Sequence, residues 1–338
     1  MQLGLSTYPG PVATPLVDSY GRAHRDLRIS VTDRCNFRCT YCMPEEGLRW
    51  VPREEILTFE EITRVARVCV ERFGFDSIRL TGGEPTVRAH LPALVGELAG
   101  LGADLSMTTN GSALRALAPA LRAAGLRRVN VSLDSLRSDR FAALTRRDEL
   151  AAVLDGIDAA VEACFDPVKV NVVCMEGTND DEVIDFAAFG RRRGIEVRFI
   201  EFMPLDADHA WSPVQVVPGE RIIAAINAVY PLRPVSRGTE PAEVFDYLDG
   251  RGRVGVVASV TNPFCVRCDR LRLTAEGRLR NCLFSHEETD VRTVMRSGGT
   301  NDELAATVAA CVAAKGPGHQ IGSVSFVQPP RTMSQIGG

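Results

Sequence analysis

The sequence predicts an α/β fold built on parallel strands, and three observations lead to this prediction. Short apolar runs alternate with longer helical patterns between about residues 27 and 203. Repeated strand–helix units favour parallel strands joined by right-handed crossovers. Residues able to carry chemistry follow the apolar runs, at the strand ends where parallel α/β folds bind ligands. A doubly wound sheet and a partial barrel both fit this pattern.

Six apolar runs are the strand candidates. Short runs of this kind, bounded by polar or glycine-containing segments, are typical of buried strands. We expect strands over residues 27–32, 77–80, 104–108, 128–133, 168–173 and 196–201.

Helical patterns fill the stretches between these strands. Thr58 and Glu61 have the spacing of a capping box, which predicts that a helix begins there. The segments 112–124 and 179–193 are each followed by glycine, as expected at a helix C-terminus. A further helix is expected over residues 150–164.

The pattern weakens between residues 204 and 250, where prolines recur. We expect connecting structure there, around one helix at residues 219–229. The prolines concerned are Pro204, Pro213, Pro218, Pro231, Pro234 and Pro241.

Composition excludes several classes of protein. The 338 residues are 45% hydrophobic, enough for a large core, and carry 39 basic and 43 acidic residues. The net charge of −4 gives no global positive field for nucleic acid or an anionic membrane. No apolar run is long enough to span a bilayer. Residues 1–25 contain three prolines and no apolar signal core, so we expect a flexible extension and a cytoplasmic location.

The ten cysteines divide into two tight groups and four isolated residues. In a chain expected to be cytoplasmic, such groups favour metal binding over disulfides. Cys69, Cys164, Cys174 and Cys311 lie apart in apolar surroundings and are interpreted as core thiols.

The first group, Cys35, Cys39 and Cys42, has the spacing C-x3-C-x2-C. Three thiolates can bind three irons of a four-iron cubane and leave the fourth open for a small molecule. A zinc loop and three unrelated thiols are the alternative interpretations.

The second group, Cys265, Cys268 and Cys282, again supplies three thiols. His286 lies four residues further on, so a Cys3His zinc site is an open alternative. Arg270 and Arg272 would face one side of an extended strand, where two guanidiniums suit a phosphate chain. An ordinary amphipathic edge strand would show the same alternation.

The first cysteine group, with an aromatic residue before its last cysteine, resembles that of radical S-adenosylmethionine (SAM) enzymes. Together with the segment 78–85, the second cysteine group and the terminal Gly-Gly, it makes the chain from about residue 27 to 338 resemble the GTP 3′,8-cyclase family of molybdenum cofactor biosynthesis. The resemblance implies a partial (β/α)6 TIM-type barrel over residues 26–215. It also implies a C-terminal domain over residues 216–338 that closes the open side.

The resemblance further implies cofactors and contact residues. One [4Fe-4S] cluster at Cys35, Cys39 and Cys42 would bind SAM, and a second at Cys265, Cys268 and Cys282 would contact the guanine of GTP. The implied SAM contacts are Tyr41, Gly83, Ser132 and Met203. The implied GTP contacts are Arg28, Arg79, Thr108, Lys169, Arg270, Leu271 and Arg272. The tail residues Gly337 and Gly338 would reach into the active site.

Each of these positions also has an ordinary structural explanation. Glycines 82 and 83 could form a plain tight turn, and Tyr41 could be a packing aromatic. Ser132 and Met203 could be structural residues at strand ends. Lys169 could face solvent, and the tail could be disordered.

The implied reaction converts GTP to (8S)-3′,8-cyclo-7,8-dihydroguanosine 5′-triphosphate. The partners expected are GTP, an unidentified electron donor and a functional link to cyclic pyranopterin monophosphate synthase, without nucleic acid or membrane. The oligomeric state stays open, a homodimer included. A radical SAM peptide-modifying enzyme with an auxiliary cluster is one alternative, although such enzymes usually carry more C-terminal cysteines. A non-catalytic zinc or redox module is the other.

Overall fold

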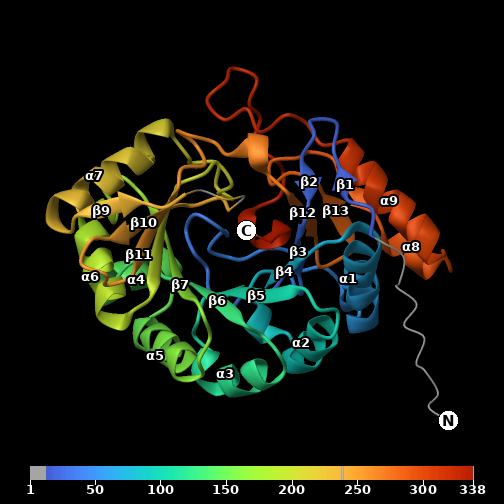
Figure 1. Ribbon diagram of the computed structural model, residues 1–338, viewed down its shortest axis with the longest axis horizontal. Helices are drawn as coiled ribbons and strands as arrows, with labels where there is room; N and C mark the ends of the chain where they lie inside the picture. Colours follow the sequence, from blue (N-terminus) through green and yellow to red (C-terminus); the bar gives the residue numbers. More distant parts are fainter. Residues whose placement is uncertain (1–12, 237, 239, 338) are drawn as a thin grey trace, which may run out of the picture.

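The computed structural model describes residues 13–236, 238 and 240–337, and its centre is a curved sheet of parallel strands (Figure 1). Six strands follow one another in chain order across the middle of this sheet. They are β3 (Asp26–Ser30), β4 (Ser77–Thr81), β5 (Asp104–Thr109), β6 (Arg128–Ser132), β7 (Val168–Cys174) and β8 (Glu196–Glu201). Each pairs in parallel with the next, which confirms the six predicted strands.

Helices cover the outer face of this sheet (Figure 1). They are α1 (Phe59–Phe73), α2 (Leu91–Ala99), α3 (Leu114–Ala123), α4 (Ser138–Thr145), α5 (Leu150–Glu162) and α6 (Val183–Arg193). The capping box predicted at Thr58 and Glu61 is present at the start of α1. The glycine after α6, Gly194, adopts the left-handed conformation that ends the helix. The segment predicted as one helix over residues 179–193 begins as the 3₁₀ turn η3 (Asp180–Glu182).

Elements from the C-terminal part extend both edges of the sheet. β11 (Arg253–Val257) pairs in parallel with β8, and β10 (Glu243–Tyr247) and β9 (Leu232–Pro234) continue from it in antiparallel fashion. On the opposite edge, β12 (Arg270–Leu273) pairs in parallel with β3. β13 (Arg278–Arg280) and β14 (Thr289–Asp290) follow β12.

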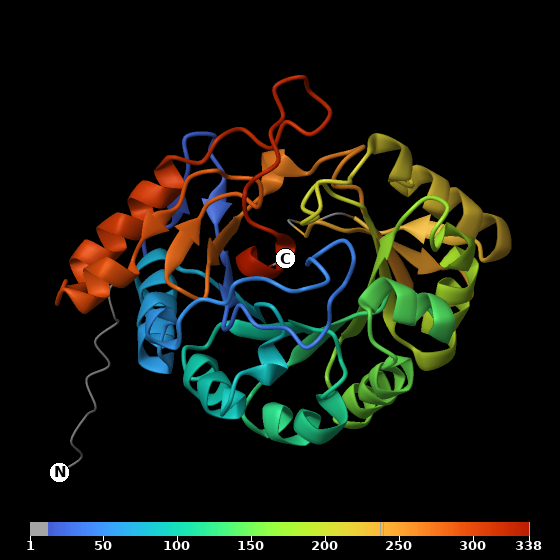
Figure 2. The same cartoon turned by 180° about the vertical axis from the view of Figure 1, so that it is seen from behind.

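The sheet is therefore an open partial barrel and not a doubly wound sheet. β9 and β14 end the sheet among the described residues and do not pair with each other. Figure 2 shows the ring from behind, with the C-terminal end of the chain at its centre. The C-terminal part also supplies the helices α8 (Arg292–Arg296), α9 (Asn301–Ala313) and α10 (Met333–Ile336).

The region of residues 204–250 requires a correction. The predicted helix is present as α7 (Gly219–Val229), but the region also contains β9 and β10, where only connecting structure was expected. The prolines in this region favoured an interpretation as connecting structure, so these strands were not predicted. Pro234 lies in the short edge strand β9, a position where the missing N–H is tolerated.

The N-terminal segment forms a small hairpin where it is described. β1 (Leu16–Val17) pairs with β2 (Ala23–His24) beside α9. The flexible extension was predicted over residues 1–25, of which residues 1–12 lie outside the described part. The domain boundaries after residues 25 and 215 stay predictions.

Alternation along the strands separates an apolar core from a polar interior. Leu27 and Ile29 are fully buried in the hydrophobic core, while Arg28 between them lines a central cavity. The parallel strand β12 repeats this arrangement with Leu271 and Leu273 around Arg272. Among the helices of the described residues, none combines the length and the apolar character needed to cross a membrane.

Candidate active site in the centre of the barrel

Two adjoining cavities occupy the centre of the barrel. The first contains the thiols of the first cysteine group, and the second contains those of the second group together with several arginines. The two cavities share the lining residues Thr108, Asn171, Ile200, Met203 and Met333. The two cavities therefore adjoin one another, between the two groups of cysteines.

The first group lies in the loop that follows β3. Cys35, Cys39 and Cys42 all line the first cavity. Burial raises the pKa of the Cys35 thiol to about 11 and that of Cys42 to about 12. Burial, followed by the charge of Cys42, also raises the pKa of Cys39 well above its usual range. The thiolate forms therefore lack a compensating charge of their own, and bound iron would supply it.

The thiols of the first group suit an iron–sulfur cluster. Cysteine thiolates are the usual ligands of such clusters, and in a four-iron cubane they bind separate irons. Cys35, Cys39 and Cys42 all line the same cavity, so they can act on one bound group.

The predicted SAM contacts gather around the same cavity. Tyr41, Gly83, Ser132 and Met203 all line it. The Tyr41 hydroxyl donates a 2.5 Å hydrogen bond to Asp134, and the Gly83 N–H donates to the Thr32 carbonyl at 2.8 Å.

The second cavity carries a concentration of positive charge. All four predicted arginines line it from adjacent strands, namely Arg28, Arg79, Arg270 and Arg272. Burial and the charge of Arg79 hold the pKa of Arg28 well below its usual range, and burial and Arg270 lower that of Arg272 to about 9. Asp26 is the carboxylate beside them, 3.5 Å from Arg28. Such an excess of cations suits a polyanionic ligand.

The second cysteine group borders the arginines. Cys265, Cys268 and Cys282 line the second cavity, the first two from either end of the 3₁₀ turn η5 (Cys265–Arg267). Burial would raise the pKa of Cys268, but Arg270 and Lys315 outweigh it and lower the value to about 6. This thiol therefore differs from those of the first group because its neighbouring cations outweigh the effect of burial on its pKa.

His286 does not join this group. Its Nε2 atom lies 3.0 Å from the Val327 carbonyl, and the residue borders a different cavity. His319 lines the second cavity instead, next to the thiols and 5.0 Å from the ring of Phe284. The Cys3His zinc alternative thus loses the histidine on which it rested.

Comparison with known proteins places this geometry in a family. Residues 29–190 match the Radical SAM superfamily, and residues 195–321 match Molybdenum Cofactor Synthesis C. GTP 3′,8-cyclase of Streptomyces coelicolor is 49% identical over 328 residues, 96% of each chain. GTP 3′,8-cyclase 2 of Mycobacterium tuberculosis is 48% identical over 336 residues, 97% of this chain and 93% of that protein.

The chain belongs to the GTP 3′,8-cyclase family. It is thus a radical SAM enzyme. Among solved structures, Streptococcus suis SuiB bound to S-adenosylmethionine aligns with a TM-score of 0.61 at 12% identity, over 84% of this chain and 69% of that one. This likeness supports the fold alone.

The sequence placed two carboxylates of this cyclase-family site at strand ends but gave no role to either. Glu84, 1% exposed, accepts hydrogen bonds from the hydroxyls of Thr86 and Thr109 and from the Asn110 N–H, each at 2.6 Å. It ties the loop after β4 to the loop after β5. Asp134 accepts from Tyr41 and from the Val173 N–H, and burial raises its pKa to about 6. Both residues directly follow predicted strands, and this position is the feature of the sequence that could have assigned them to the active site.

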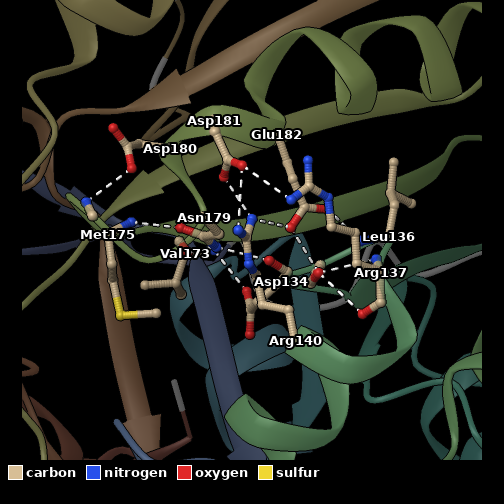
Figure 3. Close-up of polar contacts among 12 residues, drawn as sticks. Asp134, Leu136, Arg137, Arg140, Val173, Met175, Asn179, Asp180, Asp181 and Glu182 are labelled. Carbon is tan, nitrogen blue, oxygen red and sulfur yellow. Dashed lines mark hydrogen bonds and ion pairs between the residues drawn. The ribbon is translucent and has the colours of Figure 1, made fainter.

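A second layer of buried residues holds the Asp134 loop in place (Figure 3). The Asn179 side chain donates to the carbonyls of Asp134 and Val173 and accepts from the Met175 N–H. Glu182, fully buried, accepts from the Leu136 N–H at 2.7 Å. The loops after β6 and β7 are thereby fixed to one another.

Two predicted contacts are placed apart from the arginine cavity of this family member. Lys169 borders another cavity, near the amino ends of β6 to β8, and lies 3.8 Å from both Glu196 and Glu240. Burial, then the charge of Arg198, lowers its pKa to about 8. The Leu271 side chain packs in the core, so only its main chain is available for a ligand. Arg198, which lines the arginine cavity, was not predicted.

The tail of the chain enters the site through α10. Met333 and Ser334 line the first cavity, and the Gly337 carbonyl accepts a hydrogen bond from Arg272. A Cβ atom on Gly337 would lie 2.5 Å from the Thr81 hydroxyl, and its φ of +69° also favours glycine. Gly338 lies outside the described residues.

Proposed function

We propose that this chain catalyses the radical SAM-dependent cyclisation of GTP to (8S)-3′,8-cyclo-7,8-dihydroguanosine 5′-triphosphate, the first step of molybdenum cofactor biosynthesis. The observation that carries the proposal is the pair of adjoining cavities in the centre of the barrel, with three thiols in each and buried arginines in the second. The names of the 48–49% identical relatives support the same reaction.

The first cavity is the proposed SAM site. Cys35, Cys39 and Cys42 would hold a [4Fe-4S] cluster, which with SAM supplies a 5′-deoxyadenosyl radical able to remove hydrogen from C3′ of GTP. Tyr41, fixed by Asp134, would form a rigid wall for SAM. Gly83, Ser132 and Met203 would complete the contact surface.

The second cavity is the proposed GTP site. Arg28, Arg79, Arg270 and Arg272 would bind the triphosphate, since Asp26 beside them offsets only part of their charge. Cys265, Cys268 and Cys282 would hold a second [4Fe-4S] cluster whose open iron meets the guanine. Thr108 and Met203, which line both cavities, would align the ribose with SAM and exclude water.

Further contacts and partners belong to the same proposal. Lys169 would reach a phosphate after leaving Glu240, and Leu271 would contribute its main chain. The Gly337–Gly338 tail would lie against the substrate beside Arg272. An electron donor, a cytoplasmic location and a functional link to cyclic pyranopterin monophosphate synthase follow from the reaction, with a homodimer as one possible assembly.

A deuterium-transfer experiment tests the function. Protein reconstituted anaerobically with iron and sulfide is given SAM, dithionite and GTP deuterated at C3′. We expect deuterium in 5′-deoxyadenosine, detected by mass spectrometry, together with cyclised nucleotide. Unlabelled 5′-deoxyadenosine formed equally without GTP would keep the radical SAM assignment and overturn GTP as substrate, leaving a peptide as the next candidate. A protein that binds zinc and no iron would favour the non-catalytic module.

A further inference from the structure

Lys315 is a buried cation at the second cysteine group, where no role has so far been assigned to it. Only two of the 39 basic residues in the chain are lysines, Lys169 and Lys315. Lys315 is 4% exposed and follows the end of α9. Lysine is rarely buried without an anionic partner, so its surroundings need an explanation.

Three acceptors surround the Lys315 ammonium group. Its Nζ atom donates to the carbonyls of Cys268 at 3.0 Å and Arg270 at 3.1 Å, and it lies 3.4 Å from the Cys268 Sγ. Among the described residues it forms no ion pair with a carboxylate. The Cys268 sulfur is therefore its available negative partner.

Two other buried cations differ from Lys315 because carboxylates compensate their charges. Arg22, beside the second cysteine group, donates to the Cys265 and Pro317 carbonyls at 3.0 Å, but it also pairs with Asp18 at 2.6 Å. The other buried lysine, Lys169, has Glu196 and Glu240 nearby at a different cavity. The charge of Lys315 can thus act on a group bound by the second cysteines, because no carboxylate of the described residues compensates it.

We propose that Lys315 is the positioning and charge-compensating residue of the second cluster: it fixes the Cys268 loop and raises the reduction potential of the cluster. This inference rests on the second cluster of the proposed function. A cluster becomes more negative on reduction, so a fixed cation in van der Waals contact with a ligand sulfur stabilises the reduced state. The first cysteine group has no equivalent lysine.

The test isolates the second cluster. A full-length chain with Cys35, Cys39 and Cys42 replaced by alanine is reconstituted, and the midpoint potential of its cluster is measured by dithionite titration followed by electron paramagnetic resonance. Lys315→Met is compared with Arg67→Met, which removes a half-exposed cation of α1 that has no part in the proposed site. We expect Lys315→Met to hold about tenfold less reduced cluster at a fixed potential, a shift of about 59 mV for one electron. Arg67→Met should match the parent.

The outcomes separate this inference from the proposed function. A parent chain that binds no iron overturns the second cluster and this inference with it. A parent and a Lys315→Met variant with equal iron and equal potentials overturn the inference alone. If Lys315→Met binds no cluster, Lys315→Gln, which keeps a hydrogen-bond donor, is tested in its place. Its iron content and its midpoint potential are then compared with those of the parent. Loss of iron from both variants at an unchanged melting temperature supports the positioning role.

Discussion

At the scale of single residues, Gly83 explains how two active-site loops can touch. A Cβ atom at this position would lie 2.2 Å from the Arg34 carbonyl oxygen, in the loop that carries the first cysteines. That oxygen accepts from the Glu84 N–H at 2.8 Å, and backbone cannot yield as a flexible side chain would. The glycine is therefore required by the protein itself, whether or not a ligand also approaches it.

Gly83→Ala should force these loops apart. We expect a loss of about 2 kcal/mol or more in stability and fewer irons bound to the first group, since the overlap is with backbone. Iron analysis and thermal unfolding measure both effects. Gly96→Ala is the control, because Gly96 lies inside α2 with open space around it, and alanine there should be neutral or stabilising. Equal behaviour of the two variants would refute the steric argument.

Asp134 is the second residue whose effect can be measured directly. Asp134→Ala leaves the Tyr41 hydroxyl and the Val173 N–H without their partner, a change worth about 1–3 kcal/mol. We expect SAM to bind about tenfold more weakly to the reconstituted protein, measured by isothermal titration calorimetry. Asp181→Ala, in the same network but half exposed and paired with Arg140, should bind SAM normally. Unchanged affinity in Asp134→Ala would remove Tyr41 from the SAM site.

At the scale of elements, the β1–β2 hairpin contains a buried pair that responds to pH. His24 Nε2 lies 3.2 Å from Asp18, and its Nδ1 is buried without a partner. The neutral ring can donate from Nε2, whereas protonation would place a second N–H where no acceptor is present. Burial and the charge of Lys315 accordingly lower the pKa of His24 to about 4.

This shift predicts the direction of a pH effect. Because the folded pKa lies below the unfolded value near 6.5, the unfolded chain binds more protons between pH 6.5 and 4, and stability falls as pH falls through this range. Between pH 7.5 and 5.5 the cluster-free chain should lose on the order of 1 kcal/mol of stability through this group. Denaturant unfolding of wild type and His24→Gln at both pH values measures it. An equal pH dependence in both proteins would contradict the prediction.

At the scale of the whole molecule, the two cysteine groups lie in two adjoining cavities, and the proposed function gives each group a different part of the reaction. Cys35→Ala should abolish SAM cleavage, because that group is the one expected to hold the cluster that binds SAM. Cys268→Ala should leave some uncoupled SAM cleavage and no cyclised product. Separate quantification of 5′-deoxyadenosine and cyclic nucleotide distinguishes the two. Full cyclase activity in either variant would refute the assigned roles.

Local patterns predicted most of the barrel, whereas contacts between distant segments were not predictable. The capping box at Thr58 and the strand β8 each depend on a few neighbouring residues, so the sequence displays them directly. The edge strand β9 is short and contains proline, which masks its pattern. Lys315 and Glu84 owe their roles to partners far away in the sequence. The spacing of residues within a helix or strand does not predict such long-range contacts.

The pairing of β3 with β12 has a consequence for how the enzyme is made. Leu27 of the first barrel strand aligns with Leu271, near the other end of the chain. During synthesis on the ribosome, the edge of β3 that pairs with β12 therefore stays exposed until most of the chain has been made. Such an edge can pair wrongly with other chains, and long-range contacts of this kind form slowly. The C-terminal segment thus has to arrive before the first strand is protected, and clusters inserted into the finished barrel would follow the release of the chain.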